Sequence, residues 1–259
     1  MTAPRIFTAE YYERMRSLES GSWWNAAMRD AAGRLLEHAS LPERGLLVDV
    51  GCGSGQTMSW WAALHPEWMC AGLDVAPEGV QAAAAAGLAV MEGSALALPF
   101  GDHSADCAIT LDVIQHLPLK GGDEIALREM YRVLKRGGYL LIRTNAQAFP
   151  HAPEDPEFEF RKYEPRDLRQ KLASVGFDVV RLGRINALLG LVEIPRELRA
   201  KRDQARDGYH GILAQTASRG GLGSALKRKW VGLEARAVAA GWQLPLGRTI
   251  LALCRVPLT

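Results

Sequence analysis

The stretch that decides the fold runs from Leu46 to Thr57 and reads Leu-Leu-Val-Asp-Val-Gly-Cys-Gly-Ser-Gly-Gln-Thr. Its first residues form an apolar run that contains Asp49, which is typical of a buried parallel strand. Three glycines at alternate positions follow, and glycine is needed where the backbone takes a positive φ or lies against a ligand. Ser54 to His65 then read as a helix. A strand, a glycine turn and a helix N-terminus together predict a nucleotide-binding corner at the carboxyl end of a sheet strand.

The spacing of the glycines indicates which nucleotide this corner binds. A dinucleotide fingerprint needs a third glycine at the position of Gln56, so that a pyrophosphate can sit on the helix N-terminus. Asp49 places a carboxylate beside that position, and like charges repel. A ligand with an ammonium group and no phosphate fits better, and S-adenosylmethionine is such a ligand. Nineteen residues after Gly55, a second predicted strand ends in Asp74, an acid that can accept both ribose hydroxyls.

Five signals in a fixed order extend this pattern along the chain. They are Asp49–Gly55, Asp74, Gly93–Phe100 (GSALALPF), Leu111–Leu117 (LDVIQHL) and Leu134–Leu140 (LKRGGYL). In this order the chain resembles the class I S-adenosylmethionine-dependent methyltransferases of the small-molecule, Methyltransferase-11-like type. The resemblance covers roughly residues 44–184 and a last strand.

The order of the predicted elements favours an α/β fold. The predicted strands are 46–50, 69–73, 88–91, 106–111, 138–144, 177–184 and 248–255, and the predicted helices include 56–65, 77–86, 123–135, 164–175 and 224–240. Such alternation builds a mostly parallel sheet with helices on both faces. The resemblance implies a Rossmann-like sheet of seven strands with an antiparallel last strand. The run Lys135–Gly138 reads as the cationic end of a helix and its glycine stop.

We divide the chain into four parts on this basis. Residues 1–43 are expected to form an N-terminal helical lid, and 44–184 the S-adenosylmethionine-binding core. Residues 185–247 are interpreted as a helical insertion that caps the substrate side, by analogy with the family. Residues 248–259 carry the last core strand.

The resemblance assigns the cofactor contacts. Asp49 should lie near the ammonium group, Asp74 should hold the ribose, and Val75 should pack on the adenine. Ser94 stands where many relatives have an aspartate that accepts a hydrogen bond from the adenine amino group, so that contact is in question here. The complete set of expected contacts is Asp49, Gly51, Cys52, Gly53, Gly55, Asp74, Val75, Ser94, Ala95, Leu111 and Asp112.

The acceptor side is predicted from a histidine and several aromatic residues. His116 should lie near the reactive methyl group, and a histidine can take up a proton near neutral pH. It is a candidate general base or substrate ligand, with a structural loop histidine as the alternative. Tyr163 belongs to a Tyr-x-Pro-x-x-Leu stretch found before this helix in many small-molecule methyltransferases, and a simple helix start is the alternative. The expected substrate contacts are Tyr12, Trp23, Trp24, His116 and Tyr163, with hydrophobic packing as the alternative for the two tryptophans.

Composition limits the possible partners. A formal net charge of +2 gives no electrostatic footprint for nucleic acid, so no nucleic-acid partner is expected. The basic run Lys227–Lys229 is interpreted as a solvated helix face, with nucleic-acid contact as the alternative. The four cysteines show no CxxC pair or zinc spacing, so no metal is expected. No signal peptide and no run of membrane-spanning length is found, which predicts a cytoplasmic protein without a membrane partner.

The expected function is transfer of a methyl group to O, N or C of a small-molecule metabolite, leaving S-adenosylhomocysteine. Methyl transfer from a sulfonium is an in-line displacement, so alignment of the reactants should contribute most, with effective molarities of about 10⁵–10⁸ M. A general base would add roughly 10²–10⁴-fold. One alternative is a methyltransferase acting on RNA or protein, although the Asn/Asp-Pro-Pro-Tyr signature is replaced by Leu111–Ile114. Others are a catalytically silent cofactor-binding scaffold and, last, an NAD-dependent oxidoreductase.

Overall fold

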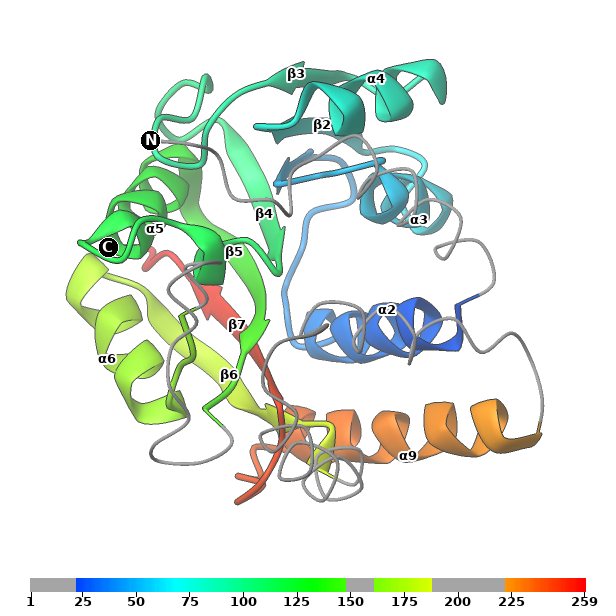
Figure 1. The fold of residues 1–259 in the computed structure, drawn as a ribbon. Helices are drawn as coiled ribbons and strands as arrows, with labels where there is room; N and C mark the ends of the chain where they lie inside the picture. Colours follow the sequence, from blue (N-terminus) through cyan, green and yellow to red (C-terminus); the bar gives the residue numbers. More distant parts are fainter. Residues whose placement is uncertain (1–21, 148–160, 188–221) are drawn as a thin grey trace, which may run out of the picture.

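The structure is a computed structural model that describes residues 22–147, 161–187 and 222–259. Its centre is a seven-stranded sheet with the order β3-β2-β1-β4-β5-β7-β6 (Figure 1). The strands are β1 (Leu46–Val50), β2 (Met69–Asp74), β3 (Val90–Glu92), β4 (Ala105–Leu111), β5 (Leu134–Asn145), β6 (Asp178–Ile185) and β7 (Thr249–Arg255). The helices are α2 (Trp23–Leu36), α3 (Gln56–Leu64), α4 (Pro77–Ala85), the short 3₁₀ helix η2 (Ile114–His116), α5 (Gly122–Val133), α6 (Pro165–Val175) and α9 (Leu222–Ala239).

The pairing of the strands confirms the predicted fold class. Strands β3, β2, β1, β4 and β5 pair in parallel. Strand β7 lies between β5 and β6 and runs antiparallel to both. The order of the strands reverses next to β1, and the crevice at the carboxyl ends of β1 and β4 is where ligands bind in open α/β sheets.

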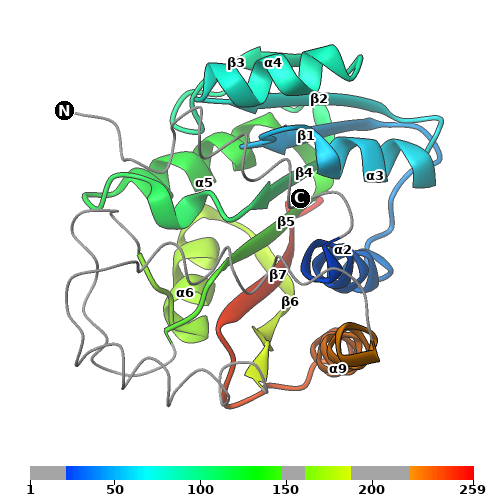
Figure 2. The same cartoon turned by 45° about the vertical axis from the view of Figure 1, so that its right-hand side comes forward.

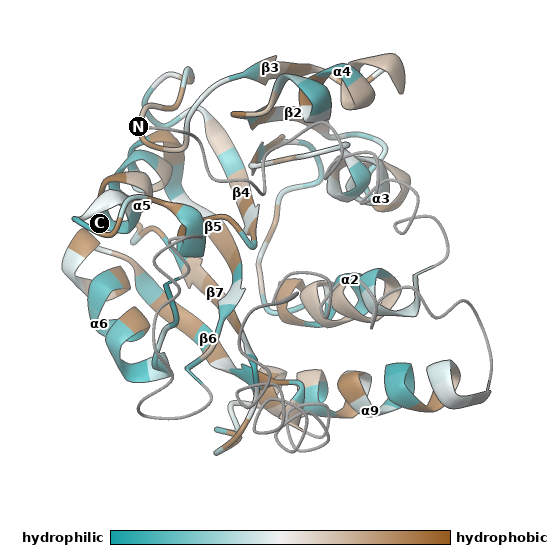
Figure 3. Ribbon diagram, viewed as in Figure 1, coloured by the Kyte–Doolittle hydropathy of each residue, from teal (hydrophilic) through white to brown (hydrophobic). Residues whose placement is uncertain are grey.

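Helices cover the sheet on both faces, as a 45° turn of the molecule makes clear (Figure 2). Alternate residues of the central strands point to opposite faces. On one face Ala108, Leu140 and Ala252 pack with α5 and α6, and on the other Ile109, Leu141 and Leu251 pack with α2 and α9. In Figure 3 the hydrophobic colours concentrate on the central strands, while α5, α6 and α9 carry hydrophilic patches. The sheet is therefore packed between two layers of helices, with a hydrophobic cluster on each face.

One predicted boundary is wrong. Helix α5 ends at Val133, and the run from Lys135 onward belongs to β5 rather than to the last turn of a helix. Leu134 pairs with Ala105 in β4, and the Lys135 ammonium lies 2.8 Å from the Asp106 carboxylate. The glycines that follow lie within β5, where the pairing with β4 shifts register between Leu134 and Tyr139, and they do not end a helix.

The predicted lid and cap are described in part. Helix α2 begins after Ser22, whose hydroxyl accepts a hydrogen bond from the backbone N–H of Asn25 at 3.4 Å. Tyr12 lies outside the described residues, as does the part of the predicted helical insertion from 188 to 221. Helix α9 packs beside α2, and its role as a cap stays a prediction. Of the helices in the described ranges, none combines the length and the apolar character needed to cross a lipid bilayer.

Candidate active site

A cavity of about 400 Å³ opens at the carboxyl ends of β1, β2 and β4. Ten of the predicted cofactor contacts line it: Asp49, Gly51, Cys52, Gly53, Asp74, Val75, Ser94, Ala95, Leu111 and Asp112. Gly55 starts α3 with φ +81°, and a Cβ there would lie 2.2 Å from Leu88. Its role in the described residues is therefore to let α3 pack closely. The crevice predicted at the switch point of the sheet is the place where the candidate residues meet.

The glycine turn leaves β1 in a conformation that a side chain would obstruct. Gly51 has φ +80°, and a Cβ at this position would lie 2.2 Å from Cγ2 of Val113. The backbone N–H groups of Gly51 and Cys52 donate to the carbonyl of Leu73 at 2.8 and 3.0 Å. Bare backbone therefore forms one wall of the cavity, and the end of β2 holds it in place.

Asp74 organises this wall as well as facing the cavity. One carboxylate oxygen accepts the backbone N–H of Gly53 at 2.8 Å, and the other accepts that of Ala76 at 2.9 Å. These two hydrogen bonds fix the glycine turn, and the Asp74 carboxylate also lines the cavity.

Asp49 is buried in the cavity wall, with 2% of its surface exposed. Among the described residues, its Oδ2 atom has no hydrogen-bond partner. Burial and, to a smaller extent, the negative charge of Asp74 raise the pKa of Asp49 to about 7, against the opposing effect of Arg143. A buried carboxylate in this state is stabilised by a cation placed against it.

Asp112 ends the fourth strand and pairs with an arginine that the sequence did not single out. Its backbone has φ +60°, and its carboxylate lies 2.5 Å from the guanidinium of Arg143 at the end of β5. Arg143, like Asn25 and Arg29 of α2, lines the cavity. A cation at the end of a buried strand was the available signal for Arg143. The N-terminal helix was expected near the substrate, but the sequence pointed to Trp23 and Trp24 rather than to Asn25 and Arg29.

His116 lines the same cavity at the end of η2. Burial lowers its pKa to about 4, although the charge of Asp112 opposes this shift. The imidazole is therefore neutral near pH 7, and its conjugate acid is too strong for the ring to be an efficient base. Hydrogen bonding to an acceptor substrate suits this side chain better than proton removal.

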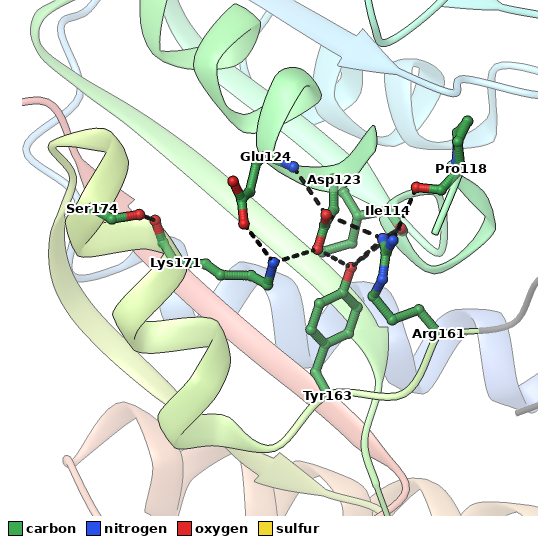
Figure 4. A network of polar contacts seen from close by, with 8 residues as sticks. All are labelled: Ile114, Pro118, Asp123, Glu124, Arg161, Tyr163, Lys171 and Ser174. Atoms are coloured by element: carbon green, nitrogen blue, oxygen red, sulfur yellow. Dashed lines mark hydrogen bonds and ion pairs between the residues drawn. The ribbon is translucent and has the colours of Figure 1, made fainter. Parts of the chain in front are cut away.

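A buried polar network holds the loop that carries His116 (Figure 4). The hydroxyl of Tyr163 lies 3.2 Å from the carbonyl of Ile114 and 3.1 Å from the carboxylate of Asp123. Arg161 donates to the carbonyl of Pro118 at 2.9 Å and pairs with Asp123 at 3.3 Å. Residues on both sides of His116 are thus fixed from the segment that precedes α6.

This network corrects the prediction for Tyr163, which was expected to face the substrate. Its side chain is 3% exposed and its hydroxyl is directed into the network. The two tryptophans need a similar correction. Trp23 is buried between α2 and α9, Trp24 packs against the same cluster, and neither is among the described residues that line the cavity. Both tryptophans therefore pack in the hydrophobic core, which was the alternative to substrate contact.

Comparison with known proteins agrees with the geometry. Residues 48–142 match the family model described as a methyltransferase domain. The chain carries a class I S-adenosylmethionine-dependent methyltransferase domain. Within the described residues, the domain presents no cluster of three or more histidine, cysteine or acidic side chains that could hold a metal ion.

Individual relatives of this methyltransferase domain differ in their acceptors. The tRNA (carboxymethyluridine(34)-5-O)-methyltransferase of Arabidopsis thaliana is 31% identical over 103 residues, which are 40% of this chain and 24% of that protein. The ajmaline N-methyltransferase of Rauvolfia serpentina is 33% identical over 140 residues, which are 50% of this chain and 45% of the relative. The chain therefore spans less than half the length of either relative.

A solved structure shares the fold. Phosphoethanolamine N-methyltransferase 2 of Haemonchus contortus, in complex with S-adenosyl-L-methionine, aligns with a TM-score of 0.64 at 15% identity. The alignment covers 98% of this chain and 58% of that one.

The cofactor of this domain class is S-adenosylmethionine, and the residues of the cavity fit it. Among the described residues, the Oδ2 atom of Asp49 has no hydrogen-bond partner, which suits a ligand ammonium group. Asp74 places a carboxylate, a hydrogen-bond acceptor, in the wall of the cavity, which suits ribose hydroxyls. Val75 is 50% exposed at the rim, where an aromatic base could cover it. The Ser94 hydroxyl accepts the backbone N–H of Leu96 at 3.2 Å, so it fixes its own loop while facing the cavity.

Proposed function

We propose that this methyltransferase acts on RNA, with transfer RNA as the acceptor class. The supporting observation for methyl transfer is the buried Asp49 carboxylate beside the bare glycine turn, whose Oδ2 atom has no hydrogen-bond partner among the described residues and suits the ammonium group of S-adenosylmethionine. For the acceptor, the support is that the relative from Arabidopsis thaliana is named as a tRNA methyltransferase. The comparisons thus favour the macromolecular alternative over the small-molecule function expected from the sequence.

Different residues of the cavity position the cofactor and the acceptor. When bound, S-adenosylmethionine supplies an electrophilic methyl group on a sulfonium sulfur. Asp49 holds the amino-acid end and Asp74 the ribose, while the bare backbone at Gly51 permits close approach. Asn25 and Arg29 from α2, with His116 from η2, form the part of the wall left for the acceptor. Orientation of the two reactants is the main contribution of such a site.

A small-molecule acceptor is the second candidate. It is supported by the similarity to ajmaline N-methyltransferase and by a cavity of about 400 Å³, which falls in the usual range for small-ligand sites. The predicted cytoplasmic location stays a prediction under either function.

The decisive experiment uses S-adenosylmethionine labelled in its methyl group. The full chain is incubated with unfractionated tRNA and, separately, with a panel of phenols, amines and carboxylic acids. We expect label in RNA that ribonuclease releases, and at least a hundredfold less with Asp74→Ala, because hydrogen bonds to a charged group contribute about 1.5–3 kcal/mol each. Asp178→Ala, an exposed acid on β6, is the matched control. Label in the panel and none in tRNA would establish the second candidate instead.

A further inference from the structure

A second hollow lies between α2 and α9, on the sheet face opposite α5 and α6. Its volume is about 1070 Å³. The two helices run side by side in both ribbon views (Figures 1 and 2). We call this hollow the α2–α9 groove. Its charged lining residues are Arg29, Asp30, Arg34, Arg228, Lys229 and Arg236.

The charge of the groove is strongly biased. Five of these six side chains are cationic and one is an acid, although the whole chain has a net charge of only +2. The single acid, Asp30, is already paired with Arg228 at 2.8 Å. The bias is local, so a balanced overall composition conceals it. A lining of this kind attracts a polyanion.

Small residues and three large apolar side chains, Trp23, Leu226 and Leu233, line the groove between its charged residues. Ala26 lies on the α2 side, and Ala225 and Gly232 lie on the α9 side. A Cβ added at Gly232 would meet no atom within 4 Å. The helices touch along a deeper line that includes Ala31 and Ala235, which are fully buried. The cations therefore stand along a channel rather than on a flat surface.

The groove is connected to the active site through one residue. Arg29 lines both the groove and the cofactor cavity. Along α9, Lys229 and Arg236 lie seven residues apart, which puts them two turns apart on one helix face. A bound chain in the groove would thus meet several cations in succession on its way to the methyl-transfer site.

We propose that the α2–α9 groove binds the phosphate backbone of the RNA acceptor and guides it toward the active site. The inference rests on the proposed function and adds its docking surface. Arginine dominates the lining, and its planar guanidinium matches phosphate oxygens in pairs. At the rim, the ammonium of Lys227 lies 5.3 Å from the ring of Trp23, which gives the basic run Lys227–Lys229 a place on the groove.

The segments that adjoin α2 and α9 in sequence are not acidic overall. Residues 1–21 and 188–221 contain nine cationic and seven acidic residues. An acidic peptide or protein is the competing occupant of the groove.

The test measures binding of fluorescently labelled, unfractionated tRNA to the full chain between 50 and 300 mM salt, chosen to cover about 0.15 M ionic strength. The groove variant is Lys229→Ala with Arg236→Ala, both exposed on α9. The control variant, Arg128→Ala with Arg136→Ala, removes two exposed cations elsewhere, from α5 and β5. Each phosphate contact contributes about 0.7–0.9 to the slope of log K against log salt. We expect the groove variant to lose about 1.5–2 of that slope and to bind at least tenfold more weakly at 100 mM salt, while the control keeps wild-type values.

Calorimetry with S-adenosylhomocysteine checks that the groove variant retains a folded cofactor site. Equal loss of tRNA affinity in the groove and control variants would overturn the docking inference. It would leave the proposed function intact if tRNA is still methylated. Polyglutamate that binds the groove as tightly as tRNA would overturn it in favour of an acidic peptide. Wild-type protein that binds tRNA through the groove without methylating it would refute only the proposed function.

Discussion

Asp49 shows how one buried carboxylate can link cofactor affinity to pH. Its carboxyl group lies among apolar strand residues and next to a second acid, Asp74, and both circumstances disfavour ionisation. Near pH 7 the group is therefore half ionised in the free protein. Only the ionised form can pair with a ligand ammonium group, so protonation competes with binding.

This competition gives a pH dependence with a defined sign. With a pKa of about 7, the ionised fraction of Asp49 falls as pH falls, and the affinity for S-adenosylhomocysteine should drop about eightfold from pH 7.5 to pH 6. Asp49→Asn should bind more weakly at pH 7.5 and lose this dependence. Isothermal titration calorimetry in matched buffers measures both, with Asp178→Asn as the control. A variant that keeps the wild-type pH profile would show that another group titrates.

His116 is expected to act as a hydrogen-bonding group, because burial keeps its pKa near 4. His116→Gln, which can still form a hydrogen bond, should retain kcat within about threefold, and His116→Ala should lose roughly tenfold. Cofactor affinity should stay within twofold of wild type in both. Steady-state kinetics of both variants between pH 6 and 8 measure these changes in kcat. Losses of about 10²-fold or more in both variants would instead support a general base.

At the scale of elements, the segment before α6 holds η2 and the start of α5 through Tyr163, Arg161 and Asp123 (Figure 4). Asp123 is 1% exposed, and Lys171 of α6 also pairs with it at 3.2 Å. Arg161 and Lys171 thus both pair with the buried carboxylate of Asp123, so its charge is not left unpaired. These contacts join α5, α6 and the segment before α6.

Removal of one hydroxyl tests this network. Tyr163→Phe should lower the free energy of unfolding by about 1–2 kcal/mol. The hydroxyl loses the hydrogen bond it donates, to Asp123 or to the carbonyl of Ile114, and the one it accepts from Arg161, while the cations keep Asp123 paired. Tyr131→Phe on α5, a half-buried tyrosine, should change it by less than about 0.5 kcal/mol. Urea denaturation measures both. If Tyr163→Phe unfolded like wild type but raised KM for the acceptor, the original expectation of a substrate contact would be restored.

At the scale of the whole molecule, Glu234 joins α9 to the end of β6. Its carboxylate is 6% exposed and accepts the backbone N–H groups of Asn186 and Ala187 and the indole N–H of Trp230, the last at 2.6 Å. Because the β6 backbone donors would be left unsatisfied, Glu234→Ala should destabilise the protein by about 2–3 kcal/mol.

Thermal unfolding followed by circular dichroism measures this loss, with Glu37→Ala, a change just after α2, as the control. The variant should still bind S-adenosylhomocysteine below its melting temperature, since Glu234 is not among the described residues that line the cofactor cavity. A melting temperature equal to that of wild type would mean that the contacts of Glu234 do not contribute to the stability of the fold.

The local parts of the site could be predicted because they depend on neighbours in sequence. The apolar run of β1, the glycines after it and Asp74 at the end of β2 each follow a short-range pattern, and the structure brings them together at one sheet edge. The roles of Tyr163, Trp23 and Trp24 could not be predicted, since an aromatic residue near a helix start suits packing as well as substrate contact.

The sequence by itself therefore determined the parallel core and the place of the cofactor, because strand alternation and the glycine turn are dictated by backbone sterics and hydrophobic periodicity. Tertiary structure alone decided which side chains converge there. Arg143 meets Asp112, and Arg228 meets Asp30 across 198 positions of the chain, only when the sheet and its two helical layers are assembled. Contacts of such sequence separation depend on packing, and no local pattern encodes them.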